Sequence, residues 1–340
     1  MNTPLAITIG FPLGLYREVS DMKQMKEEAL SMLTTLCRHS DRWETLVINS
    51  VDLFFRDGLD WQKVLPGPFK KLKRLYLCKY FGLMMESMKH WLPQIHVLYV
   101  QLLNKGPLET LSEVPWLMGI HDITLKYDKR TVITSSTRKL LQACHTLRSL
   151  HIYGACAEGG RFEAITLDSL TELTLSTRSD RFPLSLLQPP ALTSLTINGG
   201  AIFEGADPHY PCLKRLSITT GRPWLIVDHL PHSPFDSLFL NFLDSGYDRR
   251  GTKAFIGIKT HKLTIHRSSL HDATFISMLE AMSGVLEELE LVEVKVGSEF
   301  IDLFSKRDRC VQAIREFRFR NRQYQRWIWT PSAGWDFLGM

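Results

Sequence analysis

A short hydrophobic pattern, with apolar residues at its first, fourth and sixth positions, returns along the whole chain. The first copy is Trp43-Leu46-Ile48, and the later copies have their middle residue at Leu75, Leu98, Ile123, Leu150, Leu173, Leu195, Leu216, Leu238, Leu263, Leu289 and Phe317. Two copies are weaker: Thr260 takes the first position of one, and the last uses the aromatic residues Phe317 and Phe319. Successive copies lie 21 to 29 residues apart, so the pattern is a true sequence repeat.

This spacing predicts a leucine-rich-repeat solenoid of the α/β class. Side chains alternate across a strand, so the fourth and sixth positions point to one face and the third, fifth and seventh to the other. Stacked repeats merge their apolar residues into one core and pair their strands into a parallel sheet. We therefore expect a horseshoe with the sheet on its concave face and helices or extended segments on its convex face. An ordinary α/β domain is the alternative, but such sheets rarely keep a fixed strand period.

The segments between the copies differ along the chain. Helical spacing of apolar residues predicts helices at residues 20–37, with Ser20 as the N-cap, and at residues 137–145, 271–282 and 298–306. Eight of the sixteen prolines lie from Pro183 to Pro234, where we expect extended connections, because proline blocks helix interiors. A short edge strand is expected around Ile7 and Ile9.

We expect one domain over residues 1–340 with about twelve repeats. An N-terminal strand and helix would occupy residues 1–42, the repeats residues 43–320, and a C-terminal cap residues 321–340.

The composition indicates a globular chain, with 44% apolar and 23% charged residues among 340. No stretch approaches 18 consecutive apolar residues, so we expect no membrane-spanning helix. The apolar segment at residues 5–15 lacks the basic start of a signal peptide. The six cysteines are scattered without a Cys-x-x-Cys pair, which disfavours a disulfide framework and a zinc site. Reduced thiols and a cytoplasmic or nuclear location are therefore expected.

The net charge of +5 comes from the C-terminal end, since residues 306–326 carry +6 and the rest of the chain −1. Arginines there alternate with aromatic residues, a pattern that also suits single-stranded nucleic acid. A terminal repeat, however, must show a polar face to water. We favour a cap over nucleic-acid binding, with the end of the core covered by Trp327, Trp329, Trp335 and Phe337.

The sequence contains none of the usual catalytic or nucleotide-binding motifs. Glycine-rich phosphate loops, a Gly-x-Ser-x-Gly elbow and His-Glu-x-x-His are all missing. The paired histidines, His261 with His266 and His229 with His232, lack the three or four converging ligands of a metal site. We predict a non-enzymatic protein with no catalytic residues, no metal and no cofactor.

The outward strand positions would line the concave face, which suits a large protein surface. Aromatic residues and arginine dominate interface energetics. The residues predicted to bind a protein partner are Tyr76, Tyr99, His151, Tyr153, Arg215, Phe239, Glu290, Arg318 and Arg320. Tyr76 and Tyr99 hold the fifth position of neighbouring repeats and should stand side by side.

Several segments resemble the fungal F-box proteins with C-terminal leucine-rich repeats, especially those of mushroom-forming (basidiomycete) fungi. The start of the repeats is similar in residues 4–9 (PLAITI) and 39–46 (HSDRWETL), and the repeat openings are similar in residues 92–98 (LPQIHVL) and 210–216 (YPCLKRL). The resemblance spans essentially the whole chain through short motifs.

This resemblance implies a substrate receptor of a cullin–RING ubiquitin ligase, in which an F-box holds a Skp-type adaptor and the repeats hold the substrate. No Leu-Pro-x-Glu opening of an F-box stands before Ser20. A Skp-type adaptor is therefore expected as a partner only if the F-box is missing from this gene model. A repeat-only scaffold or inhibitor without a ubiquitin link, and nucleic-acid binding through the basic end, remain alternatives.

Overall fold

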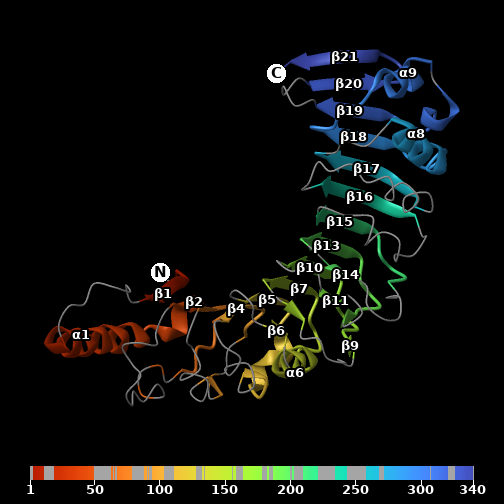
Figure 1. The fold of residues 1–340 in the computed structure, drawn as a ribbon. Coiled ribbons are helices and arrows are strands. Elements are labelled where there is room, and N and C mark those ends of the chain that lie inside the picture. The colour runs from red at the N-terminus through yellow and green to blue at the C-terminus, as the bar shows by residue number, and fades with distance from the viewer. Residues whose placement is uncertain are drawn as a thin grey trace. The chain divides into compact units, whose positions relative to one another are not determined.

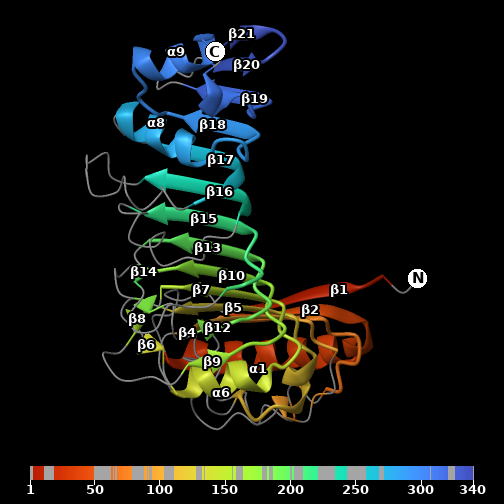
Figure 2. The same ribbon diagram turned by 90° about the vertical axis from the view of Figure 1, so that its right-hand side faces the viewer.

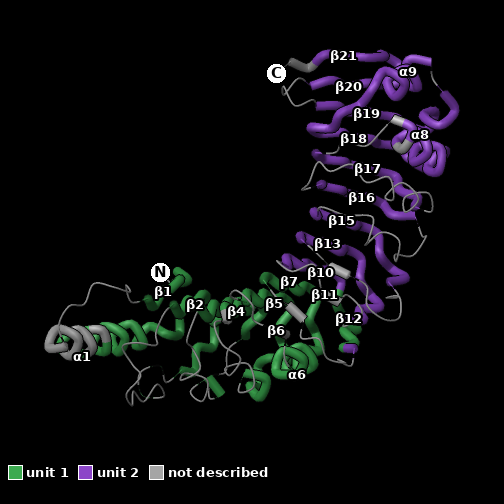
Figure 3. Tube along the Cα trace, viewed as in Figure 1, with its two compact units in different colours: residues 1–161, 165–170 green, residues 162–164, 171–340 purple. Residues whose placement is uncertain are grey.

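The structure is a computed structural model, and its ribbon is drawn in Figure 1. It describes residues 3–10, 19–49, 63, 65, 67–78, 88–89, 91, 94–102, 111–127, 132–133, 135–154, 156–157, 164–177, 182–183, 187–199, 201–202, 210–220, 234–242, 258–267, 272–306, 308–320 and 326–339. The chain divides into two compact units (Figure 3). Unit 1 holds residues 1–161 and 165–170, and unit 2 holds residues 162–164 and 171–340.

Unit 1 is built on parallel strands, each paired with the next. In order these are β1 (Leu5–Gly10), β2 (Trp43–Asn49), β3 (Arg74–Cys78), β4 (Val97–Leu102), β5 (Asp122–Tyr127) and β7 (Ser149–Tyr153). Its other elements are α1 (Val19–Cys37), η1 (Ser40–Arg42), η3 (Pro115–Gly119), α6 (Ser135–Ala143), the paired short strands β6 (Val132–Ile133) and β8 (Cys156–Ala157), and β9 (Ile165–Thr166).

Unit 2 repeats the arrangement and ends in an antiparallel hairpin (Figure 2). Its parallel strands are β10 (Glu172–Ser176), β13 (Ser194–Asn198), β15 (Arg215–Thr220), β16 (Phe235–Phe242), β17 (Thr260–His266), β18 (Glu288–Val292) and β19 (Glu316–Arg320). The hairpin is β20 (Arg326–Thr330) and β21 (Gly334–Gly339). The connections contain α8 (Asp272–Ala281), α9 (Ser298–Lys306), η6 (Arg309–Val311), β12 (Leu187–Gln188), and β11 (Phe182–Pro183) paired with β14 (Ala201–Ile202).

The predicted repeat register is confirmed within each unit. In unit 1 Leu46 pairs with Leu75, and the line continues through the fourth-position residues to Leu150. In unit 2 a second line runs from Leu173 to Phe317. All of these side chains are at most 2% exposed. The fold is a leucine-rich-repeat solenoid, whose core forms between repeats rather than within one.

The predicted edge strand at Ile7 and Ile9 is β1, and the predicted helix at residues 298–306 is α9. The other three predicted helices are present with ends shifted by one or two residues. Helix α1 begins at Val19, so Ser20 lies in its first turn and is not the N-cap. In the proline-rich stretch the described connections include the short strands β11, β12 and β14, as expected of extended segments.

The turn after the strand uses a left-handed backbone at the eighth repeat position. Gly154 and Gly199 have φ of 76° and 98°, and Arg267 and Glu293 have φ of 55° and 57°. Three of these amides continue the strand ladder, since the N–H groups of Gly199, Arg267 and Glu293 donate to the carbonyls of Thr219, Val292 and Arg320. The turn therefore adds one more backbone hydrogen bond between repeats, and it also directs the chain away from the sheet.

Aromatic side chains complete the core of unit 1 behind β2 to β4. Phe69 stacks on Trp43 at 5.1 Å and meets the edge of Trp91 at 4.6 Å between ring centres. The Trp91 Nε1–H donates to the Leu65 carbonyl at 3.1 Å, and the Trp116 Nε1–H to the Met88 carbonyl at 3.1 Å. The Trp91 and Trp116 indoles thus link successive repeats, because they bury their rings and still satisfy their N–H donors.

The end of the unit 2 core is covered by the C-terminal hairpin. Trp329 and Trp335 contact Phe304 at 5.2 and 6.1 Å, and Trp335 meets Phe317 at 5.2 Å. Trp327 and Phe337 lie on the same face of the sheet, because they are partners in the antiparallel register, and their rings are 4.7 Å apart. Phe319, expected to be a buried anchor, is only half-buried, since no further parallel repeat follows it.

A glycine pair offers a test of the eighth-position turn. A Cβ at Gly199 would clash with the Thr177 carbonyl oxygen, whereas one at Gly284, also left-handed at φ 82°, meets nothing within 4 Å. We expect Gly199→Ala to lower the free energy of unfolding by more than about 3 kcal/mol and Gly284→Ala by about 1–2 kcal/mol. Urea denaturation followed by circular dichroism measures both. Equal losses would show that the close approach of the repeats does not require glycine.

Candidate protein-binding face

The surface formed by the third, fifth and seventh repeat positions is here called the exposed sheet face. Each unit has its own, on the side of the sheet opposite the leucine core. The nine predicted partner-binding residues all lie on it: Tyr76, Tyr99, His151 and Tyr153 in unit 1, and Arg215, Phe239, Glu290, Arg318 and Arg320 in unit 2. Strand register holds the backbone of each one in place.

Tyr76 and Tyr99 stand side by side, as predicted. They are Cα partners in β3 and β4, and their ring centres are 5.8 Å apart with 33° between the planes. Both side chains are half-buried. An aromatic pair of this kind contributes about 0.5–1.5 kcal/mol beyond the area that it buries, so each ring positions the other before any partner arrives.

A second aromatic pair lies at the end of unit 1. His151 and Tyr153 stack with ring centres 6.4 Å apart and 6° between planes, and Tyr153 is 37% exposed. The Ser149 hydroxyl lies 3.1 Å from Nε2 of His151 and holds the imidazole. The pair presents an apolar ring surface with polar atoms at its edge, which suits a partner surface that combines apolar groups with hydrogen-bonding groups.

The phenol of Tyr99 remains neutral over a wide pH range. Burial raises its pKa, and the nearby ionisable groups of Cys78 and Tyr153 raise it further. A neutral phenol can both donate and accept a hydrogen bond. The tyrosine surface of unit 1 therefore offers hydrogen bonding without charge.

In unit 2, Phe239 of β16 meets His266 of β17 edge to face at 4.8 Å and 60°. Burial lowers the pKa of the His266 imidazole. The carboxylates of Glu290 and Glu293 oppose this shift, whereas the positive charges of Arg267 and Arg320 lower the pKa further. The imidazole is therefore neutral at pH 7, and this patch is apolar rather than cationic.

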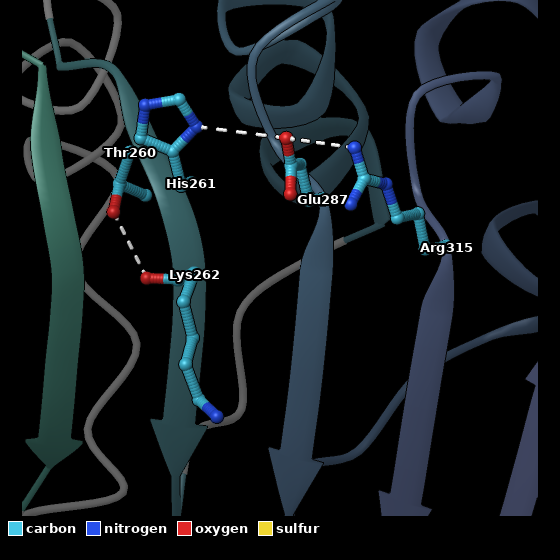
Figure 4. Close-up of polar contacts among 5 residues, drawn as sticks. All are labelled: Thr260, His261, Lys262, Glu287 and Arg315. Atoms are coloured by element: carbon cyan, nitrogen blue, oxygen red, sulfur yellow. Dashed lines mark hydrogen bonds and ion pairs between the residues drawn. The ribbon is translucent and has the colours of Figure 1, made fainter.

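Several charges on and beside this face are paired between repeats. Arg215 lies 3.6 Å from Glu172, Lys262 lies 2.7 Å from Glu288, and the Lys262 contact lowers the pKa of Glu288. Figure 4 shows a similar row at the strand starts, where Glu287 lies between His261 at 4.0 Å and Arg315 at 3.4 Å. Exposed pairs contribute little stability, so their main effect is to cancel charge along the array.

Three predicted residues, Glu290, Arg318 and Arg320, come together at a groove of about 500 Å³ on β17 to β20. His266, Val292, Arg326 and Ile328 also line it. The sequence reasoning missed Arg326 and Ile328, which it assigned to the cap. The antiparallel register places them opposite Arg320 and Arg318, so the hairpin extends the exposed sheet face beyond the last repeat.

The described residues give no metal centre, since no group of three or more potential His, Cys, Asp or Glu ligands occurs among them. His261 and His266 lie near opposite ends of β17. His229 and His232 fall outside the described residues. No helix in the described part of the chain is long and apolar enough to cross a membrane.

The depressed pKa of His266 can be tested by NMR titration. We expect a wild-type pKa below the ordinary value of about 6.5, and Phe239→Ala should raise it towards that value by exposing the imidazole. Because the folded pKa is lowered, the stability linked to this group falls as the pH drops below the unfolded pKa. Ser217→Ala, on the other side of Phe239 in the register, is the matched control. An unchanged titration in Phe239→Ala would mean that Phe239 does not shield the ring.

Comparison with known proteins adds only a distant structural likeness. No protein-family profile matches the chain, and no curated protein does either. Among solved structures the chain is similar to an internalin from Listeria monocytogenes, with 11% identity and a TM-score of 0.39 over 82% of this chain and 89% of that one. The leucine-rich-repeat fold thus stands on the spacing and register of this chain's own strands.

Proposed function

We propose that the protein is a protein–protein interaction module whose partner binds the exposed sheet face. The observation that carries this proposal is the Tyr76–Tyr99 pair, two large rings that neighbouring strands hold 5.8 Å apart with their surfaces partly open. Tyrosine buries a large contact area at a protein interface and orders few torsions in doing so.

The strands also lower the cost of binding. Association is opposed by the ordering of side chains and loops at the interface. The backbone of Tyr76 and Tyr99 is already fixed by hydrogen bonds to the strands on both sides, and the two rings pack against each other. Little ordering remains, which favours recognition of a folded partner by a preformed surface.

The tyrosine pair gives the direct test. We expect Tyr76→Ala/Tyr99→Ala to reduce partner capture at least tenfold, because truncation of one interface hot spot costs about 2 kcal/mol or more. Affinity purification with quantitative identification of the bound proteins measures it. Lys139→Ala, an exposed site on α6, is the control and should capture as wild type does. Undiminished capture by the double variant, with an unchanged melting temperature, would reject this face.

The finer proposal is substrate recognition in an F-box-type ubiquitin-ligase context, in the cytoplasm or nucleus. Its support is the resemblance carried by residues 4–9, 39–46, 92–98 and 210–216. The compartment is supported by Cys144, Cys212 and Cys310, which are not disulfide-linked. Burial raises the pKa of the Cys144 thiol to about 12, so it remains protonated and unreactive.

The ligase proposal predicts an F-box encoded upstream of these repeats. Sequencing of the transcript from its 5′ end should reveal Leu-Pro-x-Glu followed by about forty helical residues, and the extended product should co-purify with a Skp-type adaptor. A transcript without such a segment, or an extended product that does not bind the adaptor, would instead favour a repeat-only scaffold or inhibitor that occupies its partner's surface.

A further inference from the structure

We propose that the groove on β17 to β20 binds an extended acidic segment of a protein partner. This inference rests on the proposed function, since it assigns a partner chemistry to one part of the exposed sheet face of unit 2. Three arginines, Arg318, Arg320 and Arg326, line the groove, whose volume is about 500 Å³.

Two of these arginines face each other across the hairpin. Arg320 of β19 and Arg326 of β20 are direct Cα partners in the antiparallel register. Side chains in such a pair start with their Cβ atoms only about 4.5–5.5 Å apart, and like charges there repel. An anion placed between them would relieve this repulsion and accept hydrogen bonds from both guanidinium groups.

The local positive charge stands out from the rest of the face. Lys262 is neutralised by Glu288 at 2.7 Å, and Arg267 by Glu293 at 3.2 Å. Arg318 is paired with Glu316. Arg326 is exposed and has no ion pair with any residue that the structure describes. Three arginines against the single carboxylate of Glu290 line the groove, which therefore carries net positive charge.

The groove also contains features that suit a peptide better than a nucleic acid. Glu290 lies among the arginines and can accept a hydrogen bond from the backbone N–H of an extended peptide, a donor that a phosphodiester backbone lacks. Val292 and Ile328 add apolar surface. The four strands span about 15 Å, the length of four or five extended residues.

The test uses fluorescence anisotropy of the whole chain with a fluorescein-labelled octaglutamate peptide in about 50 mM salt. We expect octaglutamate to bind at least tenfold tighter than octaglutamine. Arg320→Gln/Arg326→Gln should weaken octaglutamate at least tenfold. Lys306→Gln/Arg309→Gln is the matched control, because it removes two positive charges from the same basic region at exposed sites on α9 and η6, and it should change binding less than twofold.

The fold of the variants is checked by melting temperature. We expect Arg320→Gln/Arg326→Gln to keep the wild-type fold. If that variant does not fold, Arg326→Gln alone, at an exposed side chain, should still weaken octaglutamate at least threefold. Equal binding of octaglutamate and octaglutamine, or equal loss in the control, would overturn the proposal.

An eight-nucleotide single-stranded RNA separates the two classes of anion. It should bind more weakly than octaglutamate, because its backbone has no N–H donor for the Glu290 carboxylate. RNA binding tighter than octaglutamate would overturn the peptide proposal in favour of nucleic acid. Tyr76 and Tyr99 belong to unit 1 and do not line the groove. A chain that captures its partner through these tyrosines but does not bind octaglutamate would therefore disprove the groove proposal and leave the proposed function standing.

Discussion

The in-register pairing of parallel strands is the constraint on which the rest of the structure depends. Because side chains alternate along a strand with a period of two, a slip of one residue would exchange the two faces of the sheet. Leu195 would then leave its line between Leu173 and Leu216, and Thr196 would enter the core. The fully buried fourth positions prevent this slip, and the same register decides which side chains remain on the outside.

The turn after each strand shows that backbone pairing outweighs local preference. Arg267 and Glu293 are not glycines, yet both adopt the left-handed conformation, which costs about 1–2 kcal/mol per residue. Their side chains pair at 3.2 Å, but an exposed pair of this kind offsets only part of that cost. Their N–H groups donate to the carbonyls of Val292 and Arg320 at 2.9 and 2.7 Å. These hydrogen bonds between repeats hold the turn, whichever residue occupies it.

The sequence predicted the register and the outward residues because both follow from one period. The sequence predicted helix ends less well. The N-cap was assigned to Ser20 from its residue type alone, whereas α1 begins one residue earlier, at Val19. Beyond Phe317 the period stops, so nothing indicated that the chain reverses into a hairpin. For that reason Arg326 and Ile328 were missed, and Phe319 was expected to be buried although only Trp327 pairs with it on that side.

The aromatic residues at the fifth repeat position lie on the exposed sheet face and not in the core. At the fifth position the fold accepts small polar residues, as Thr124, Thr174, Thr196 and Ser217 show. Tyr76, Tyr99 and Phe239 occupy the same position, so strand formation does not demand their rings. These rings are only half-buried, and open aromatic surface on a folded protein risks association with other molecules. Folding does not require these rings, and this supports the proposal that they contact a partner. The proposed acidic ligand would explain the arginine pair at the end of unit 2 in the same way, in terms of charge.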